Sequence, residues 1–115
     1  MIWGMNKPHR LFKAFADETR LRILNLLAQR PYCVCEFQSV LRVPQPKISR
    51  HLAYLRRNDL ATEKRRGKWI IYSLAAPRDR VHAALLHCVK GCFQEIDFFK
   101  RDLQRARKTK PICCA

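Results

Sequence analysis

The chain has 115 residues, and its 24 Lys and Arg against nine Asp and Glu give a formal net charge of +15. This length suits one domain with a modest core, and such a charge favours a polyanionic partner, nucleic acid before an acidic membrane. The sequence has three glycines, no phosphate-binding loop and no carboxylate pair in an apolar setting, so an enzyme is not expected. It also lacks a membrane-length apolar run and a secretory signal, so we expect a cytoplasmic protein without a membrane partner.

The first part of the chain predicts two helices. Residues 7–15 form a short first helix with several apolar positions. Asp17 then caps a second helix over 18–29, which ends at Arg30 and Pro31. The leucines of the second helix recur on one side, so this helix is expected to lie in the core.

A helix-turn-helix follows. The third helix is expected over 33–41, and Val43 with Pro44 breaks the chain. Gln45 caps the fourth helix because a residue before a proline avoids helical geometry, and Pro46 opens that helix. Two helices joined by a short turn are typical of DNA-binding proteins, in which the second helix enters the major groove.

The fourth helix has one apolar stripe, because Ile48, Leu52 and Leu55 recur at helical spacing. Its other faces are polar, and the side chains that we expect to meet bases or phosphates are Gln45, Lys47, Ser49, Arg50, His51 and Tyr54. For His51 we expect a phosphate contact rather than a metal. A solvated amphipathic helix is the alternative, and the nine basic and two acidic side chains of residues 42–68 argue against it.

A β-hairpin is predicted directly after this helix. Strands over 62–66 and 68–74 flank Gly67, and the second strand is rich in β-forming residues. The basic side chains of the tip that we expect to reach phosphates or a minor groove are Arg65, Arg66 and Lys68. An exposed basic turn without a ligand is the alternative.

The last predicted helix runs from Pro77 to about Arg105. Its apolar side chains follow each other at steps of three or four, namely Val81, Leu85, Cys88, Cys92, Ile96 and Phe99. So long a helix exceeds what this small domain can cover, so we expect this stripe, with the first helix, to form a homodimer interface. The expected organisation is a DNA-binding and dimerisation domain over 1–107 and a mobile basic tail over 108–115 that ends in two cysteines.

The six cysteines form three pairs, Cys33/Cys35, Cys88/Cys92 and Cys113/Cys114. In a reducing compartment they indicate metal binding or thiol chemistry rather than structural disulfides. The first pair would lie about 200° apart on an ideal helix, so both sulfurs could bind one ion only if the helix deforms. The second pair shares one helix face and could chelate, although packed interface cysteines are as plausible. The third pair could supply a further sulfur, close a redox bond with another pair, or be dispensable.

Four stretches of the chain, residues 16–24, 32–37, 44–52 and 65–72, jointly resemble the ArsR/SmtB family of bacterial metal-responsive winged-helix repressors. The resemblance implies a mainly α fold with a small β-hairpin, in the order α-α-α-α-β-β-α. It also implies a dimer, formed through the last and first helices, on an imperfect inverted repeat of double-stranded operator DNA. Ligand binding is expected to release the DNA.

The Cys33-Val34-Cys35 segment is most similar to the arsenite and cadmium/lead branches of that family. The arsenite pattern carries a further cysteine where this chain has Gln38, and the cadmium pattern uses N-terminal cysteines that residues 1–15 lack. The zinc pattern uses Asp and His in the last helix, at a spacing that Asp79, His82 and His87 do not match.

We therefore expect a repressor of a metal(loid)-resistance operon whose inducer is As(III), an organoarsenical or a related thiophilic ion. The expected ligands are Cys33, Cys35, Cys113 and Cys114, without an organic cofactor. The alternatives are a sensor of cadmium or lead, a sensor of thiol oxidation or persulfide, and a constitutive nucleic-acid-binding winged helix with inert cysteines.

Overall fold

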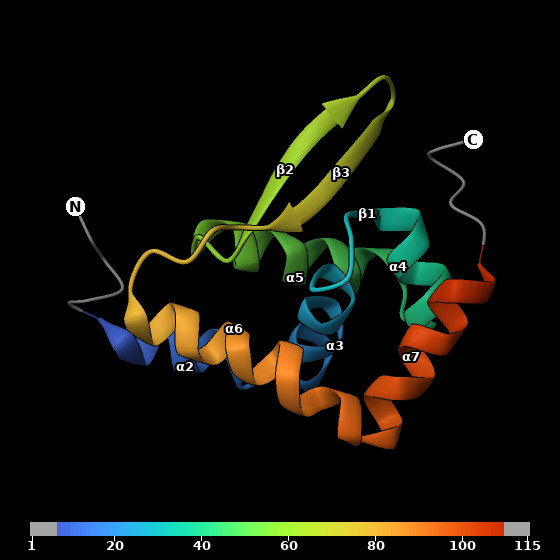
Figure 1. Cartoon of the computed structure of the whole chain (residues 1–115). Helices are drawn as coiled ribbons and strands as arrows, with labels where there is room; N and C mark the ends of the chain where they lie inside the picture. The colour runs from blue at the N-terminus through green and yellow to red at the C-terminus, as the bar shows by residue number, and fades with distance from the viewer. Residues whose placement is uncertain (1–6, 110–115) are drawn as a thin grey trace.

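A computed structural model describes residues 7–109 as a helical body from which one β-hairpin projects (Figure 1). The helices are α2 (Pro8–Phe15), α3 (Glu18–Leu27), α4 (Val34–Leu41), α5 (Gln45–Arg57), α6 (Arg80–Cys92) and α7 (Asp97–Lys108), with the 3-10 turn η1 (Phe93–Glu95) before α7. The strands β1 (Tyr32–Cys33), β2 (Ala61–Arg66) and β3 (Trp69–Leu74) form an antiparallel sheet in the order β1-β3-β2. The expected mainly helical fold with a hairpin is confirmed.

Helix α3 is the centre of the core and contacts α2, α5, α6 and α7. Its start is fixed by Asp17, whose carboxylate accepts a hydrogen bond of 3.0 Å from the Arg20 backbone N–H. The side chains of Ile23, Leu24 and Leu26 are fully buried, and each contributes about 1.5–3 kcal/mol. None of the described helices is both long and apolar enough to cross a bilayer.

The turn between α4 and α5 corrects one predicted cap. Pro44, rather than Gln45, precedes the first turn of α5, because its backbone is already extended. The Pro44 carbonyl accepts hydrogen bonds of 3.1 Å from the N–H groups of Lys47 and Ile48. Gln45 is therefore the first residue of α5. At the other end, Asp59 adopts a left-handed conformation (φ 59°), which commonly ends a helix.

Strand β1 was not expected, and it removes Cys33 from the predicted third helix. Tyr32 pairs with Tyr72, and Cys33 pairs with Ile71. Two residues carry too little of an alternating pattern to signal a strand, and the partner strand lies far along the chain. Cys33 is extended and caps α4, which begins at Val34.

The prediction of a single long last helix was wrong. The chain forms α6, then η1, then an extended Ile96 (φ −102°, ψ 116°), and α7 turns away from α6 and rises along one side of the body toward α4 (Figure 1). This turn buries Phe99, Leu103 and Ala106 in their own chain, which a straight helix would have left uncovered. The start also differs, because α6 begins at Arg80 rather than Pro77.

Buried charges tie α7 to the end of α4. The fully buried carboxylate of Asp102 accepts hydrogen bonds from Arg22 at 2.8 and 2.9 Å and from Arg105 at 2.6 Å. Arg22 also donates to the Leu41 carbonyl at 3.2 Å, and Arg105 donates to the Val40 carbonyl at 2.8 Å. We call Asp102, Arg22 and Arg105 the Asp102 clamp. It joins α3, α4 and α7 just before the turn into α5.

Candidate DNA-binding surface and thiol site

The apolar stripe of α5 fixes which side chains the helix exposes. Ile48, Leu52 and Leu55 are fully buried, so the helix is anchored along this stripe. The opposite side carries the exposed side chains Gln45, Lys47, Ser49 and Arg50. These amide, hydroxyl and cationic groups can bind base edges and phosphates.

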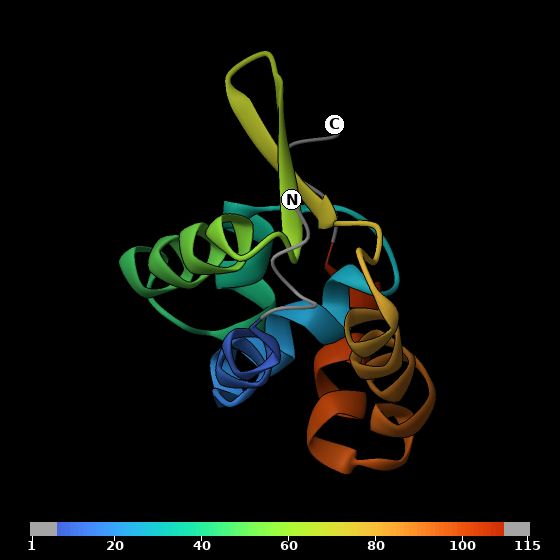
Figure 2. The same ribbon diagram turned by 90° about the vertical axis from the view of Figure 1, so that its left-hand side faces the viewer.

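The hairpin of β2 and β3 rises beside α5 (Figures 1 and 2). Gly67 forms its tip with a φ of +62°, a conformation that side-chain-bearing residues seldom adopt. Arg65, Arg66 and Lys68 are exposed around this turn. The reading surface is therefore defined here as Gln45, Lys47, Ser49, Arg50, Arg65, Arg66 and Lys68.

His51 and Tyr54 do not lie on the open side of α5. The His51 side chain is only 14% exposed, and its ring nitrogens lie 3.4 Å from Arg20 and 3.7 Å from Asp17. The Arg20 guanidinium also stacks on the Tyr54 ring at 4.3 Å. Burial lowers the pKa of His51, and Asp17 opposes that shift. The predicted open placement of His51 is therefore corrected, because a contact with α3 that the sequence does not signal covers it.

The structure brings the first cysteine pair together. The Sγ atoms of Cys33 and Cys35 lie 2.9 Å apart, so the expected 200° separation is wrong. The reason is that Cys33 lies in β1, outside the helix, and is buried, whereas Cys35 is half-buried in the first turn of α4. The Cys33 N–H donates to Glu36 Oε1 at 3.0 Å, which fixes the start of α4. Burial, with the Glu36 charge, raises the pKa of the Cys35 thiol.

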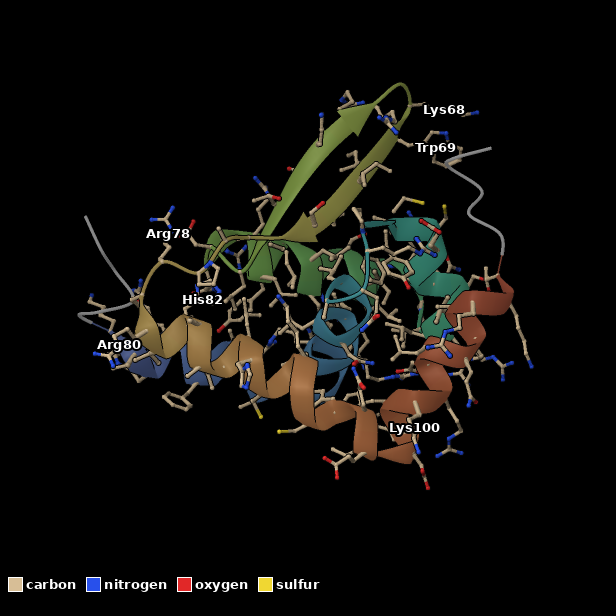
Figure 3. The ribbon with its side chains drawn as sticks, in the orientation of Figure 1. Lys68, Trp69, Arg78, Arg80, His82 and Lys100 are labelled. Carbon is tan, nitrogen blue, oxygen red and sulfur yellow. The ribbon has the colours of Figure 1, made fainter. Side chains whose placement is uncertain are left out.

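A cavity of about 290 Å³ connects these two sulfur atoms to the reading surface. We call it the thiol cavity. Its walls come from α4, the start of α5 and the hairpin, and they are Cys33, Val34, Cys35, Gln45, Lys68, Trp69 and Ile70. Lys68 and Trp69 lie at the outer end of the hairpin (Figure 3). A ligand bound to the two sulfur atoms would therefore lie beside residues that we expect to contact DNA.

No group of three His, Cys, Asp or Glu side chains suited to a metal ion occurs within residues 7–109. Asp79 is used as the cap of α6 and accepts the His82 N–H at 2.9 Å. The buried His82 ring accepts the Arg78 backbone N–H at 3.2 Å. The predicted ligands Cys113 and Cys114 lie outside the described residues.

The side chains predicted to form the dimer interface differ in exposure in the structure. Val81 and Leu85 are half-buried against their own core, while Cys88, Cys92 and Ile96 are exposed. Phe99 is only 6% exposed and stacks on Phe93 with ring centroids 4.2 Å apart, so its expected place in an interface was wrong. Sequence reasoning missed Phe12 of α2, whose ring is 55% exposed.

Comparison with known proteins identifies the family. The model of the bacterial regulatory proteins of the arsR family matches residues 17–63. The arsenical resistance operon repressor of Escherichia coli K12 is 40% identical over 111 residues, 92% of this chain and 95% of that protein.

Two solved structures share the fold. Reduced HlyU from Vibrio cholerae has a TM-score of 0.64 and 35% identity, over 77% of this chain and 93% of that one. The homodimeric winged helix-turn-helix DNA-binding domain of Mb0332 from Mycobacterium bovis has a TM-score of 0.63 and 26% identity, over 82% of this chain and 85% of that one. The chain therefore belongs to the arsR family of bacterial regulatory proteins, and it is a winged helix-turn-helix, DNA-binding transcriptional regulator and not an enzyme.

Proposed function

We propose that the protein represses an arsenical-resistance operon and leaves its operator when As(III) or an organoarsenical binds Cys33 and Cys35. The observation that carries this proposal is the distance of 2.9 Å between the two sulfurs in a cavity shared with the reading surface. The name of the relative from Escherichia coli supports arsenic ahead of cadmium or lead. Soft thiolate ligands suit all these ions.

The thiol cavity supplies a route from inducer to DNA. An arsenical on Cys33 and Cys35 adds atoms beside Gln45 and Lys68, two members of the reading surface. A ligand shifts an equilibrium only by its difference in affinity for the two states. A hundredfold loss of operator affinity requires about 2.7 kcal/mol of coupling. Displacement of the start of α5 relative to the hairpin supplies that difference.

For inorganic As(III), which prefers three thiolates, we assign the third to Cys113 or Cys114. The end of α7 supports this assignment, because Arg107 lines the same hollow as Arg30 and Tyr32, and Tyr32 directly precedes Cys33. Cys113 follows Thr109 by four residues, which can span at most roughly 14 Å. The hollow shared by Arg107 and Tyr32 thus brings the end of α7 next to the strand that carries Cys33.

We further propose that the protein binds double-stranded operator DNA as a homodimer. The side chains on α2, α6 and the segment after η1 that remain uncovered are Phe12, Cys88, Cys92 and Ile96. The homodimeric relative from Mycobacterium bovis supports this arrangement. Two reading surfaces would then meet half-sites about one helical turn apart, in an imperfect inverted repeat.

Sedimentation tests the dimer. Phe12→Glu with Ile96→Glu should give folded monomers that bind the operator much more weakly, since both side chains are exposed in the protomer. Gln94→Glu, on the exposed surface of η1, is the matched control for added charge. A wild-type protein that stays monomeric in solution and on the operator contradicts the dimer.

A DNA-release assay tests the inducer. Fluorescence anisotropy of a labelled operator is followed while As(III), methylated As(III), Sb(III), Cd(II), Pb(II), Zn(II) or peroxide is added. We expect release by the arsenicals. Release by peroxide alone would indicate a redox sensor, and no release by any thiophile would indicate a constitutive DNA-binding protein.

A separate variant tests the assignment of the third thiolate. Cys113→Ser with Cys114→Ser should raise the As(III) concentration needed for release while preserving the response to monomethylated As(III), which needs only two thiolates. X-ray absorption of the As(III) complex counts the sulfurs. Three sulfurs in this double variant would move the third ligand to Cys88 or Cys92.

A further inference from the structure

The Arg20 side chain joins three helices near the start of α3. Helix α3 packs against both α2 and α5, and the half-buried Arg20 contacts both of these neighbours. Its Nε atom donates to the Ala14 carbonyl at 2.8 Å, and its Nη2 atom donates to the Lys13 carbonyl at 3.0 Å. Both carbonyls belong to the last turn of α2, where the negative end of the helix dipole favours a cation. One edge of the guanidinium thus binds the end of α2.

The rest of the guanidinium contacts α5. Its Cζ atom lies 4.3 Å from the centre of the Tyr54 ring, over the face of that ring. Its Nη1 atom lies 3.4 Å from His51 Nδ1. Because arginine can only donate, His51 Nδ1 is the acceptor, and the neutral ring carries its proton on Nε2, which lies 3.7 Å from Asp17. One planar group therefore links α2 to α5.

These contacts lie on one flank of the apolar stripe of α5. The stripe of Ile48, Leu52 and Leu55 follows one line, about which the helix could still roll. At 100° per residue, His51 and Tyr54 lie roughly 60–130° around the helix from that line. A roll of about 10° moves a side chain at the helix surface by roughly 1 Å, because a helix with its side chains has a radius of about 5–6 Å. A second line of contact on this flank fixes the roll.

We propose that Arg20 is a positioning residue for DNA recognition, which fixes the roll of α5 through His51 and Tyr54 and thereby sets operator selectivity. Hydrogen bonds to bases depend steeply on distance and angle, whereas contacts to phosphates carry no sequence information. A roll of α5 should therefore lower the affinity for the operator far more than the affinity for random DNA. This role involves neither the cysteines nor an inducer, so it goes beyond the proposed function.

The test compares operator with random DNA in the absence of any inducer. A duplex that the wild-type protein selects from a random library serves as the operator, and a scrambled duplex of equal composition serves as random DNA. Arg20→Met removes the guanidinium and keeps an unbranched apolar side chain. We expect the ratio of operator affinity to random-DNA affinity to fall by about tenfold, roughly the value of one base contact.

A second variant separates the position of the guanidinium from its charge. Arg20→Lys keeps the cation, but one ammonium group cannot bind two carbonyls along an edge and also cover the Tyr54 ring with a planar face. The affinity ratio should therefore fall for Arg20→Lys as well. Arg101→Met is the matched control, because it removes an exposed cation from α7 and should keep the wild-type ratio.

Two further measurements separate positioning from folding. Nitrogen-15 NMR of the His51 ring should show an unprotonated, hydrogen-bonded Nδ1 in the wild type, and this hydrogen bond should be lost in both Arg20 variants. Urea unfolding reports the stability of each variant. Tyr54→Leu removes the ring from α5 itself and leaves the start of α3 intact, so it should lower the affinity ratio as Arg20→Met does.

A wild-type affinity ratio in folded Arg20→Met would overturn the proposal, whatever the change in stability. If Arg20→Met does not fold, a wild-type ratio in Tyr54→Leu would overturn it instead. Equal losses on operator and random DNA would also overturn it, because they would indicate an effect of charge or folding alone. A failure of arsenicals to release the protein from DNA does not bear on this test, which contains no inducer.

Discussion

The two cysteine pairs within the described residues carry the same chemistry in opposite settings. Cys33 and Cys35 come from a strand end and a helix start, are largely covered, and share a cavity with Gln45 and Lys68. Cys88 and Cys92 are exposed on a single helix. The difference teaches that thiols alone do not make a switch. A ligand can control DNA binding only where its atoms meet elements that also meet DNA.

The largest expected effect concerns the Asp102 clamp, which holds α4, and with it the first cysteine pair, against α3 and α7. Asp102→Ala leaves Arg22 and Arg105 without their buried carboxylate, so the free energy of unfolding should fall by about 3–5 kcal/mol. We expect a loss at the lower end of this range, about 3 kcal/mol, because the Arg105 side chain is 31% exposed. Urea unfolding measures the loss.

Asp97→Ala is the control for that change. Its carboxylate is 87% exposed and 3.8 Å from Lys100, so the loss should stay within about 0.5 kcal/mol. Similar small losses for both variants would show that the Asp102 clamp does not hold α4.

The next largest effect compares how the two cysteine pairs contribute to release by As(III). Cys33→Ser with Cys35→Ser should raise the As(III) concentration for half-release by at least about 100-fold, or roughly 2.7 kcal/mol. Cys88→Ser with Cys92→Ser should change it by less than about threefold, or roughly 0.6 kcal/mol. Anisotropy titrations are normalised to the operator affinity of each variant. The reverse ranking would place the switch on α6.

A third test separates two walls of the thiol cavity. Gln45→Ala should cost about 1–3 kcal/mol on the operator and little on random DNA, if Gln45 reads a base. Lys68→Ala should weaken both DNAs alike and reduce the salt slope by about one. Titrations at several salt concentrations measure both. Equal losses on both DNAs for Gln45→Ala would remove this residue from base reading.

The smallest effect concerns the anchored start of α6, in contrast to its exposed end. His82 is 1% exposed, its ring accepts the Arg78 N–H, and burial lowers its pKa from 6.5. The unfolded chain therefore takes up the proton first, so stability is full above about pH 6.5 and falls as the pH drops below it. His51, whose pKa is also lowered, adds to the same slope.

His82→Asn should flatten this pH dependence between about pH 7 and 5 in urea unfolding, because one of the two contributing imidazoles is gone. An unchanged slope in His82→Asn would mean that His82 does not titrate differently in the folded chain.

Local signals in the sequence predicted much of the fold and of the reading surface. Asp17 capped its helix as expected, and the stripe of Ile48, Leu52 and Leu55 was buried. That stripe correctly placed Gln45 and Arg50 on the exposed side. Such features depend on neighbours within a few residues, which periodicity and capping report.

What the sequence did not reveal depends on distant partners. The apolar steps from Cys92 through Ile96 to Phe99 continue across the break before α7, so periodicity alone predicted one helix. Cys33 was placed in a helix because its pairing with Ile71 is invisible locally. The cavity between thiols and reading surface could not be predicted for the same reason.

The Asp102 clamp has a consequence for engineering this protein. A reporter attached after Lys108 would transmit mechanical load through α7 to Asp102, and from there to the backbone that leads into α5. A truncation before Asp97 would strand Arg22 as a largely buried cation without its counter-ion. A fusion at this end therefore acts on the Asp102 clamp, whereas a fusion ahead of α2 acts on α5 through Arg20, which donates to the Lys13 and Ala14 carbonyls and contacts His51.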